Sequence, residues 1–241
     1  MVKKLIMACL VLAVLAALAL PATASAIQIG ETVGSEFKEL ATKSLFTGTN
    51  VGRLKFVNSS LGVITECPKA VLTGEVSNNG TSGEVVEANV TTATVSGEGA
   101  EANGMKECIG ESSFGSFTLT TNGNNVDGEN IANGTPWCVK TIKGTDEFQV
   151  TGGLCKTEPR SISLIMDTTV VGVCTYSRAE AMKGSFTTHE TGDALLTFKS
   201  GANSTFTKTA GGVFCPTSFS LEVSFTLETD SGTVTPLYIK K

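Results

Sequence analysis

Six cysteines follow the N-terminal apolar segment of this chain, at positions 67, 108, 138, 155, 174 and 215. An even number of cysteines in an exported chain predicts disulfide bonds, although six cysteines allow fifteen pairings. The spacing narrows the choice, because Cys67 and Cys108 are 41 residues apart, as are Cys174 and Cys215. We therefore predict the pairs Cys67–Cys108, Cys138–Cys155 and Cys174–Cys215. Pairing across the two sets, such as Cys67 with Cys215, is the alternative.

The second cysteine pair repeats the first at a displacement of 107 positions, and a similar phrase follows each pair. The phrase SFTL begins at Ser116 and again at Ser224, a displacement of 108. Weaker echoes that need small gaps are Leu72–Val76 with Met182–Phe186, and Asn58–Ser60 with Asp167–Thr169. Chance resemblance in a Thr-rich chain is the alternative, but the agreement between cysteine spacing and phrase favours an internal duplication.

Residues 1–26 predict a cleaved export signal. Lys3 and Lys4 precede an apolar run, and Ala24 and Ala26 supply the small side chains of a cleavage site. The run is shorter than the ~20 residues needed to span a bilayer, and no second run of that length follows. We expect a secreted, extracellular chain with no membrane span after cleavage. Its predicted parts are a lead-in (27–53), a first β repeat (54–123), a connecting hairpin (124–160), and a second β repeat with a C-terminal strand (161–241).

Alternating apolar residues predict an all-β fold. Leu221, Val223, Phe225 and Leu227 occupy every second position and define one buried strand face. The same alternation occurs at Phe117 and Leu119, at Ile162, Leu164 and Met166, and at Ala194, Leu196 and Phe198. Frequent Gly and Asn turn signals separate such segments. We expect an antiparallel β-sandwich or a partly closed barrel, built from two pseudo-symmetric halves and braced by disulfides.

Two further local patterns carry predictions. Residues 137–142 and 146–150 flank Lys143-Gly144-Thr145, which predicts a hairpin. Phe37, Leu40, Ala41, Ser44 and Leu45 have the spacing of a short amphipathic helix.

The charge balance restricts the partners. Removal of Lys3 and Lys4 with the export signal changes the net charge from −5 to −7, and the remaining charges are scattered. A mildly acidic chain without a basic patch does not predict binding to nucleic acid.

Residues suited to catalysis or metal binding are few. The one histidine, His189, lies in a turn-like segment, and the serines Ser112 and Ser113 lack the spacing of a nucleophile elbow. One histidine and no CxxC motif predict no zinc site. Residues 122–130 are rich in oxygen ligands but do not fit an EF-hand, which leaves a non-standard calcium loop with Asp127 and Glu129 as the alternative to a solvated turn. The candidate carboxylate pairs for glycoside hydrolysis are Asp146 with Glu147, Glu101 with Glu107, and Glu222 with Glu228.

Trp137 and the glycosylation sequons have structural and functional interpretations. Trp137 precedes Cys138, so we expect it to pack beside a disulfide, with stacking on a sugar or partner as the alternative. Asn-x-Ser/Thr sequons occur at Asn58, Asn79, Asn89, Asn133 and Asn203, and they matter only in a eukaryotic secretory pathway.

Three segments carry a resemblance to other proteins. Thr145–Cys155, Cys215-Pro216 and Ser224–Asp230 resemble uncharacterised exported all-β proteins of bacteria, and the similarity runs through most of the chain after residue 26. These proteins form no named family, so the resemblance implies bacterial export and unmodified sequons but assigns no functional residue.

The leading hypothesis is an exported, non-catalytic β-protein that serves as a binding or structural module and has no catalytic residue, metal or cofactor. A glycan or another component of the cell envelope is the partner class that we expect. The alternatives are a carrier of a small apolar ligand and, less favoured, a polysaccharide-acting hydrolase.

Overall fold

The computed structural model describes residues 28–33, 36–80, 84–98, 101–102, 105–110, 115–121, 136–188, 193–230 and 234–240. Nearly all of the regular structure in these ranges is antiparallel strand, which confirms the predicted all-β class. Outside the strands, the one helical element in the described residues is a single 3-10 turn, η2 (Ala202–Ser204).

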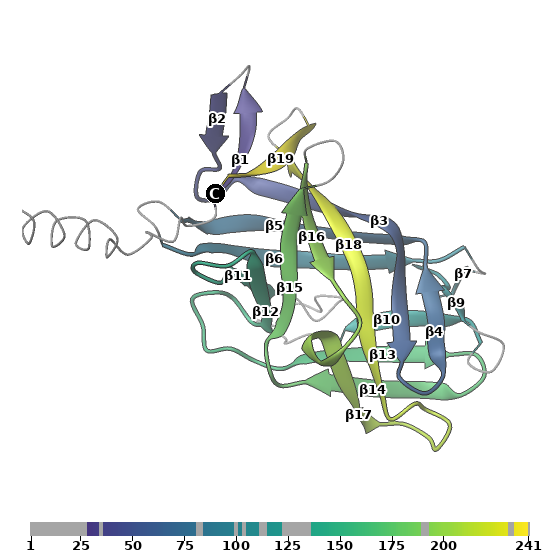
Figure 1. Ribbon diagram of the computed structural model, residues 1–241. Coiled ribbons are helices and arrows are strands. Elements are labelled where there is room, and N and C mark those ends of the chain that lie inside the picture. Colours follow the sequence, from purple (N-terminus) through teal and green to yellow (C-terminus); the bar gives the residue numbers. More distant parts are fainter. Residues whose placement is uncertain are drawn as a thin grey trace, which may run out of the picture.

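Eight strands close into an antiparallel barrel (Figure 1). These strands are β3 (Leu45–Asn58), β5 (Lys69–Asn79), β6 (Val86–Ser96), β11 (Trp137–Thr141), β12 (Glu147–Gly152), β15 (Met182–Thr188), β16 (Ala194–Phe198) and β18 (Ser218–Asp230). Each strand pairs with the next in this order, and β18 returns to β3 with Phe225 opposite Asn50. Of the two predicted architectures, the chain therefore adopts the barrel, and its ring is fully closed.

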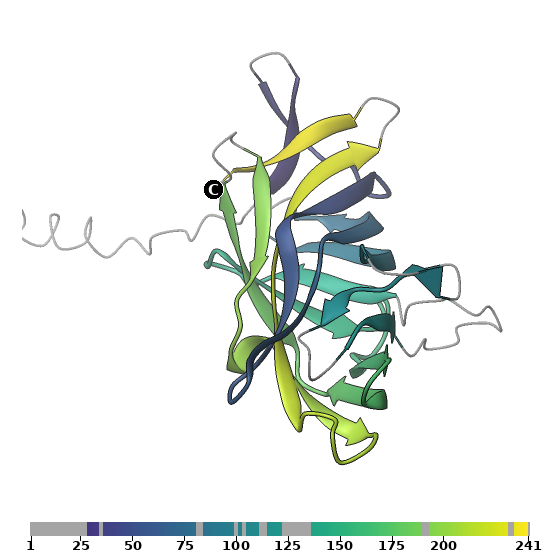
Figure 2. The same cartoon turned by 90° about the vertical axis from the view of Figure 1, so that its right-hand side faces the viewer.

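The same hydrogen-bonded sheet continues beyond the barrel at one end, and we call this part the second sheet. It contains β10 (Phe117–Thr121), β13 (Ile162–Thr168), β14 (Gly172–Arg178), β17 (Thr205–Ala210), β4 (Gly62–Cys67) and β9 (Ile109–Gly110). The first half of β18 and the second half of β3 join these strands, in the order β10-β13-β14-β17-β18-β3-β4-β9. Figures 1 and 2 show β18 running from this sheet up into the barrel. The two long strands β3 and β18 therefore connect the barrel and the second sheet.

A β-bulge bends β3 where it passes from the barrel into the second sheet. The pairing of β3 with β18 shifts between Ser224, which lies opposite Val51, and Glu222, which lies opposite Lys55. Gly52 occupies the bulge with φ of 77°, a conformation that glycine adopts without steric cost. A bulge increases local twist, so β3 can leave the ring at this point. The predicted boundary between residues 53 and 54 therefore falls inside one strand.

The remaining strands lie at the edges of the molecule. They are β1 (Gln28–Val33), β2 (Glu36–Glu39), β19 (Val234–Lys240), β7 (Glu101–Ala102) and β8 (Met105–Lys106). The prediction of a short helix across Phe37 to Leu45 is wrong, because Phe37 lies in β2 and Leu45 begins β3. β2 pairs with β1, which also pairs with β19, and this pairing overrides a five-residue pattern too short to specify a helix.

The three disulfides have the predicted pairing. Cys67 is bonded to Cys108, Cys138 to Cys155 and Cys174 to Cys215. All six half-cystines are buried. Because disulfides form and persist in oxidising compartments, these bonds indicate an extracellular type of environment.

The core follows the predicted strand faces. Val223, Phe225 and Leu227 are buried and Leu221 is half-buried. Also buried are Ile162, Leu164 and Met166 of β13 and Ala194, Leu196 and Phe198 of β16. Phe117 and Leu119 lie in β10, and their side chains are outside the described residues. The hairpin around Lys143-Gly144-Thr145 is also confirmed, since β11 pairs with β12.

Each predicted repeat contributes a strand that pairs with a strand of the other repeat. The duplication itself stays a prediction. β10 of the first segment pairs with β13 of the second, and β18 of the second pairs with β3 of the first. The SFTL phrase makes Phe117 equivalent to Phe225, but the strand register does not. Phe117 lies opposite Thr168, which begins the turn before β14. Extending the β18–β3 register by one residue puts Phe219 opposite Asn58, which begins the turn before β4. Phe219, rather than Phe225, therefore occupies the place of Phe117.

Candidate functional site: the apolar barrel interior

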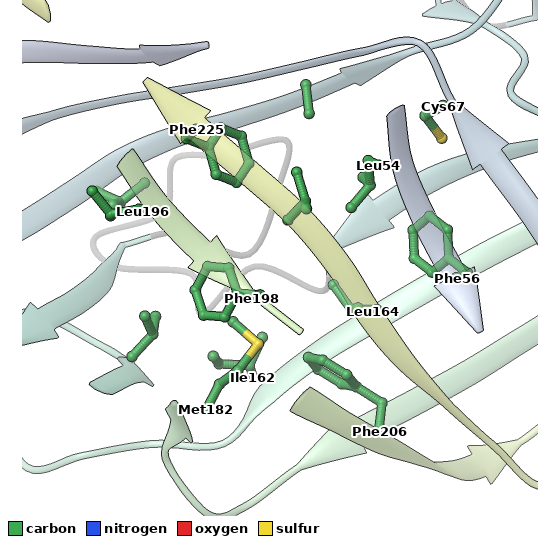
Figure 3. Packing of buried hydrophobic residues seen from close by; sticks show 14 of the residues in the cluster. Leu54, Phe56, Cys67, Ile162, Leu164, Met182, Leu196, Phe198, Phe206 and Phe225 are labelled. Carbon is green, nitrogen blue, oxygen red and sulfur yellow. The ribbon is translucent and has the colours of Figure 1, made fainter. Parts of the chain in front are cut away.

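The barrel encloses a cavity of about 120 Å³. Every barrel strand contributes to its wall, and Leu196, Phe198 and Phe225 point into the interior (Figure 3). At the end next to the second sheet, the wall is completed by Ile162, Leu164 and Phe206. The alternation of side chains along the strands explains this arrangement, because every second residue faces the same side.

Two cross-strand pairs of phenylalanine and glycine shape the interior. Phe46 lies opposite Gly74 on β5, and Phe148 lies opposite Gly184 on β15. A Cβ atom on Gly184 would lie 2.4 Å from Cζ of Phe148, and one on Gly74 would lie 2.7 Å from Cζ of Phe46. The rings therefore cover the glycines directly. Such aromatic coverage supports a glycine within a curved sheet.

The cavity wall is almost entirely apolar. Among its described lining residues none is charged, and the polar ones are Asn79, Thr94 and Thr141. The Thr141 hydroxyl accepts a hydrogen bond from the Val86 backbone N–H at 2.9 Å, so its oxygen is already engaged. An apolar cavity of this kind stays free of ordered water and suits a small apolar molecule.

Trp137 contributes to this wall. It is half-buried and packs against the core cluster. Because adjacent residues of a strand face opposite sides, Trp137 points toward the barrel interior while Cys138 points outward to Cys155. The expected packing of the indole on the disulfide is therefore replaced by packing inside the barrel.

The structure does not test five of the residues that the sequence offered for catalysis or calcium binding. His189, Ser112, Ser113, Asp127 and Glu129 lie outside the described residues.

Among the carboxylate pairs, Glu222 and Glu228 lie on the same strand rather than on opposite walls of a cleft, and Glu222 forms an ion pair with Lys55 at 3.7 Å. Asp146 lies in the turn between β11 and β12, and Glu147 begins β12. Glu107 is half-buried beside Cys108, and the side chain of Glu101 is outside the described residues.

Two of the five sequon asparagines have structural roles. Asn58 is buried, its Nδ2 donates to the Ser218 carbonyl at 2.7 Å, and its Oδ1 accepts from the Ser60 and Leu61 N–H groups. Asn89 is also buried and accepts a hydrogen bond from the Cys155 N–H at 2.9 Å. Asn79 lines the cavity, Asn203 is exposed within η2, and Asn133 lies outside the described residues.

A second hollow, of about 420 Å³, lies on the outer surface of the barrel over β12, β15 and β16. We call it the outer groove; it is lined by Glu147, Lys183, Gly184, Ser185, Thr197 and residues 199–203. Nothing in the sequence alone marks Lys183 or Lys199 as members of one site. The two lysines are 16 positions apart in the chain, so only the pairing of strands shows that they line the same groove.

Fold and cavity together define the chain as a closed, disulfide-braced antiparallel barrel with an apolar interior. No family model, curated protein or solved structure matches the chain. In the described residues, no helix has the length and apolar character needed to cross a bilayer. Within the same ranges, no group of three His, Cys, Asp or Glu side chains is arranged to hold a metal ion.

Proposed function

We propose that the protein is an exported, non-catalytic binding protein whose barrel holds a small apolar ligand. The supporting observation is the cavity, which is enclosed by eight strands and has no charged lining residue among those described. Eight-stranded barrels have interiors wide enough for filling side chains or for one small ligand. Here large side chains fill most of the interior but leave a space of about 120 Å³.

The size of this space indicates the ligand class. An engineered apolar cavity of about 150 Å³ in another protein binds benzene. The space here is slightly smaller, so it suits one ring or a short branched hydrocarbon group. A polar ligand of equal size would lose its hydrogen bonds to water without replacement, at a cost of roughly 1–3 kcal/mol per group.

The proposal includes export with removal of residues 1–26. The Lys-rich start, apolar run and small residues at 24 and 26 support it, and the three disulfides fit an oxidising destination.

The ligand proposal is tested by thermal unfolding of residues 27–241 with benzene or with pyrimidine, a ring of equal size that carries two hydrogen-bond acceptors. Ligand that binds only the folded state stabilises it by mass action. We expect benzene to raise the unfolding midpoint in a concentration-dependent manner and pyrimidine to leave it unchanged.

A matched pair of variants locates the binding site. Ala88 lines the cavity, whereas Ala210 is exposed at the end of β17. Ala88→Leu should fill the cavity and abolish the benzene effect, and Ala210→Leu should retain it. No stabilisation by benzene, or equal stabilisation of both variants, would reject the proposal.

A further inference from the structure

The outer groove is formed by the polar face of the barrel and by the segment that carries η2. Lys183 and Ser185 project outward from β15, because Met182 and Phe186 on the same strand are buried in the core. Thr197 projects outward from β16 by the same alternation. Residues 199–203 form the opposite wall. The groove is thus separate from the apolar cavity on the inner side of the same strands.

Strand register brings two lysines together in this groove. Ser185 of β15 lies opposite Thr197 of β16. Lys199 directly follows the end of β16 at Phe198, and both Lys183 and Lys199 line the groove. Like charges that share one groove repel each other. Both lysines are exposed, and neither forms an ion pair with a carboxylate among the described residues.

The neighbouring charges leave the groove locally positive. Glu147 lies opposite Ser185 and is the one acidic residue of the described lining. The groove therefore carries two positive charges against one negative charge in a chain whose net charge is −5. An anionic group between the two ammonium groups would offset their repulsion.

Hydrogen bonds to neighbouring residues fix the groove wall formed by residues 199–203. Arg178 on β14 donates from Nη1 to the Ala202 carbonyl at 3.0 Å and to the Thr205 carbonyl at 2.8 Å. The Ser204 hydroxyl donates to the Lys199 carbonyl at 2.7 Å, and the Thr205 hydroxyl donates to the Gly201 carbonyl at 2.7 Å. These contacts order the wall without a ligand, and such preorganisation reduces the entropy lost on binding.

The remaining lining groups match a ligand with several hydroxyls. Ser185 and Ser200 offer hydroxyls and Asn203 offers an amide, all of which both donate and accept hydrogen bonds. The hollow of about 420 Å³ is within the usual range for small-molecule sites, ~300–1,000 Å³, and is much larger than a single inorganic anion.

We infer that the outer groove binds an acidic saccharide. Its carboxylate lies between Lys183 and Lys199, and its hydroxyls contact Ser185, Ser200 and Asn203. This inference is independent of the apolar ligand proposed for the barrel interior, since the two sites lie on opposite sides of the sheet.

Calorimetric titration of residues 27–241 tests the inference with three probe classes. The first is a set of trisaccharides of galacturonic, glucuronic or mannuronic acid, the second is the corresponding neutral trisaccharides, and the third is inorganic phosphate. We expect at least one uronate to bind at least tenfold more tightly than its neutral counterpart and than phosphate, with affinity that decreases as salt is added. Binding of no uronate, or equal binding of acidic and neutral sugars, would overturn the inference, as would binding of phosphate alone.

Charge variants show whether the two lysines are responsible. The double variant Lys183→Gln/Lys199→Gln should lower uronate affinity at least tenfold, and Glu147→Gln should raise it. The matched control is Lys69→Gln/Lys156→Gln, which removes two exposed lysines elsewhere and should leave affinity unchanged. The charge-retaining pair Lys183→Arg/Lys199→Arg should keep most of the affinity. If both double Gln variants bind equally, the assignment to the outer groove is wrong.

Discussion

At the scale of single residues, Tyr176 is an unusual member of the core. It is fully buried on β14, its ring lies 4.5 Å from that of Phe219, and its hydroxyl has no hydrogen-bond partner among the described residues. A buried hydroxyl without a partner retains the full cost of leaving water. Burial also raises the pKa of Tyr176 from 10.0 to about 12, because the charged phenolate is poorly solvated there.

Tyr176→Phe should stabilise the protein by about 1 kcal/mol, since it removes the unpaired hydroxyl and keeps the ring. Urea denaturation measures the change. A loss of stability at neutral pH would show that the hydroxyl makes a favourable contact instead.

The pH dependence gives a second readout of the same residue. The folded-state pKa of Tyr176 lies above its unfolded value, so its contribution to stability is complete below pH 10 and is lost as the pH rises toward 12. Over this window the free energy of unfolding should fall more steeply for the wild type than for Tyr176→Phe. Equal slopes would contradict the raised pKa.

At the scale of elements, Arg178 connects β14 to the loop between β16 and β17. Its side chain is only 9% exposed and donates to three backbone carbonyls, those of Ala181, Ala202 and Thr205. Its contact with Glu180 is long, at 3.9 Å, and Glu180 is largely exposed. Backbone carbonyls, rather than a carboxylate, are therefore the main partners of this guanidinium.

Arg178→Gln should destabilise the protein by about 2–3 kcal/mol, because several carbonyls lose a charged donor at once. Hydrogen exchange should increase at the Ser204 amide, which bonds to the Gly201 carbonyl in the same loop. Arg160→Gln, which changes an exposed arginine, is the control and should alter stability by less than about 0.5 kcal/mol. Unchanged exchange at Ser204 in Arg178→Gln would show that the loop is ordered by other contacts.

At the scale of the whole molecule, two long strands and three disulfides connect the parts. β3 and β18 belong to both sheets, so the barrel and the second sheet share one core. The Cys67–Cys108 and Cys174–Cys215 bonds begin at strands of the second sheet, whereas Cys138–Cys155 braces the barrel strand β11. The disulfides therefore brace both regions.

Removal of a disulfide should destabilise the protein according to the chain length that it closes. The loop-entropy relation predicts a loss of ~4 kcal/mol for Cys174→Ala/Cys215→Ala, which opens a separation of 41, and ~3 kcal/mol for Cys138→Ala/Cys155→Ala, which opens one of 17. Chemical denaturation of the unreduced variants measures both losses. Peptide mapping should recover a fragment that links Cys67 to Cys108, and one that links Cys67 to Cys215 would contradict the pairing.

The sequence alone determined the local structure and the sulfur chemistry. Alternation along Leu221–Leu227 predicted the buried face of β18, because a strand has a period of two whatever it pairs with. Equal cysteine spacing predicted Cys67–Cys108 and Cys174–Cys215, and Cys138–Cys155 followed as the remaining pair. The hairpin at Lys143-Gly144-Thr145 was predictable because its turn and both strands are adjacent in the chain.

Only the tertiary structure decided barrel closure and the candidate sites. Closure pairs Phe225 with Asn50, which are far apart in the chain, and alternating residues look the same in a sandwich and in a barrel. Phe37 and Leu45 had helical spacing but lie in separate strands, because long-range pairing outweighs a short local pattern. Lys183 and Lys199 line one groove only because β15 pairs with β16, and the apolar cavity exists only once eight strands have met. Contacts between distant segments set these features, and no local run of residues encodes them.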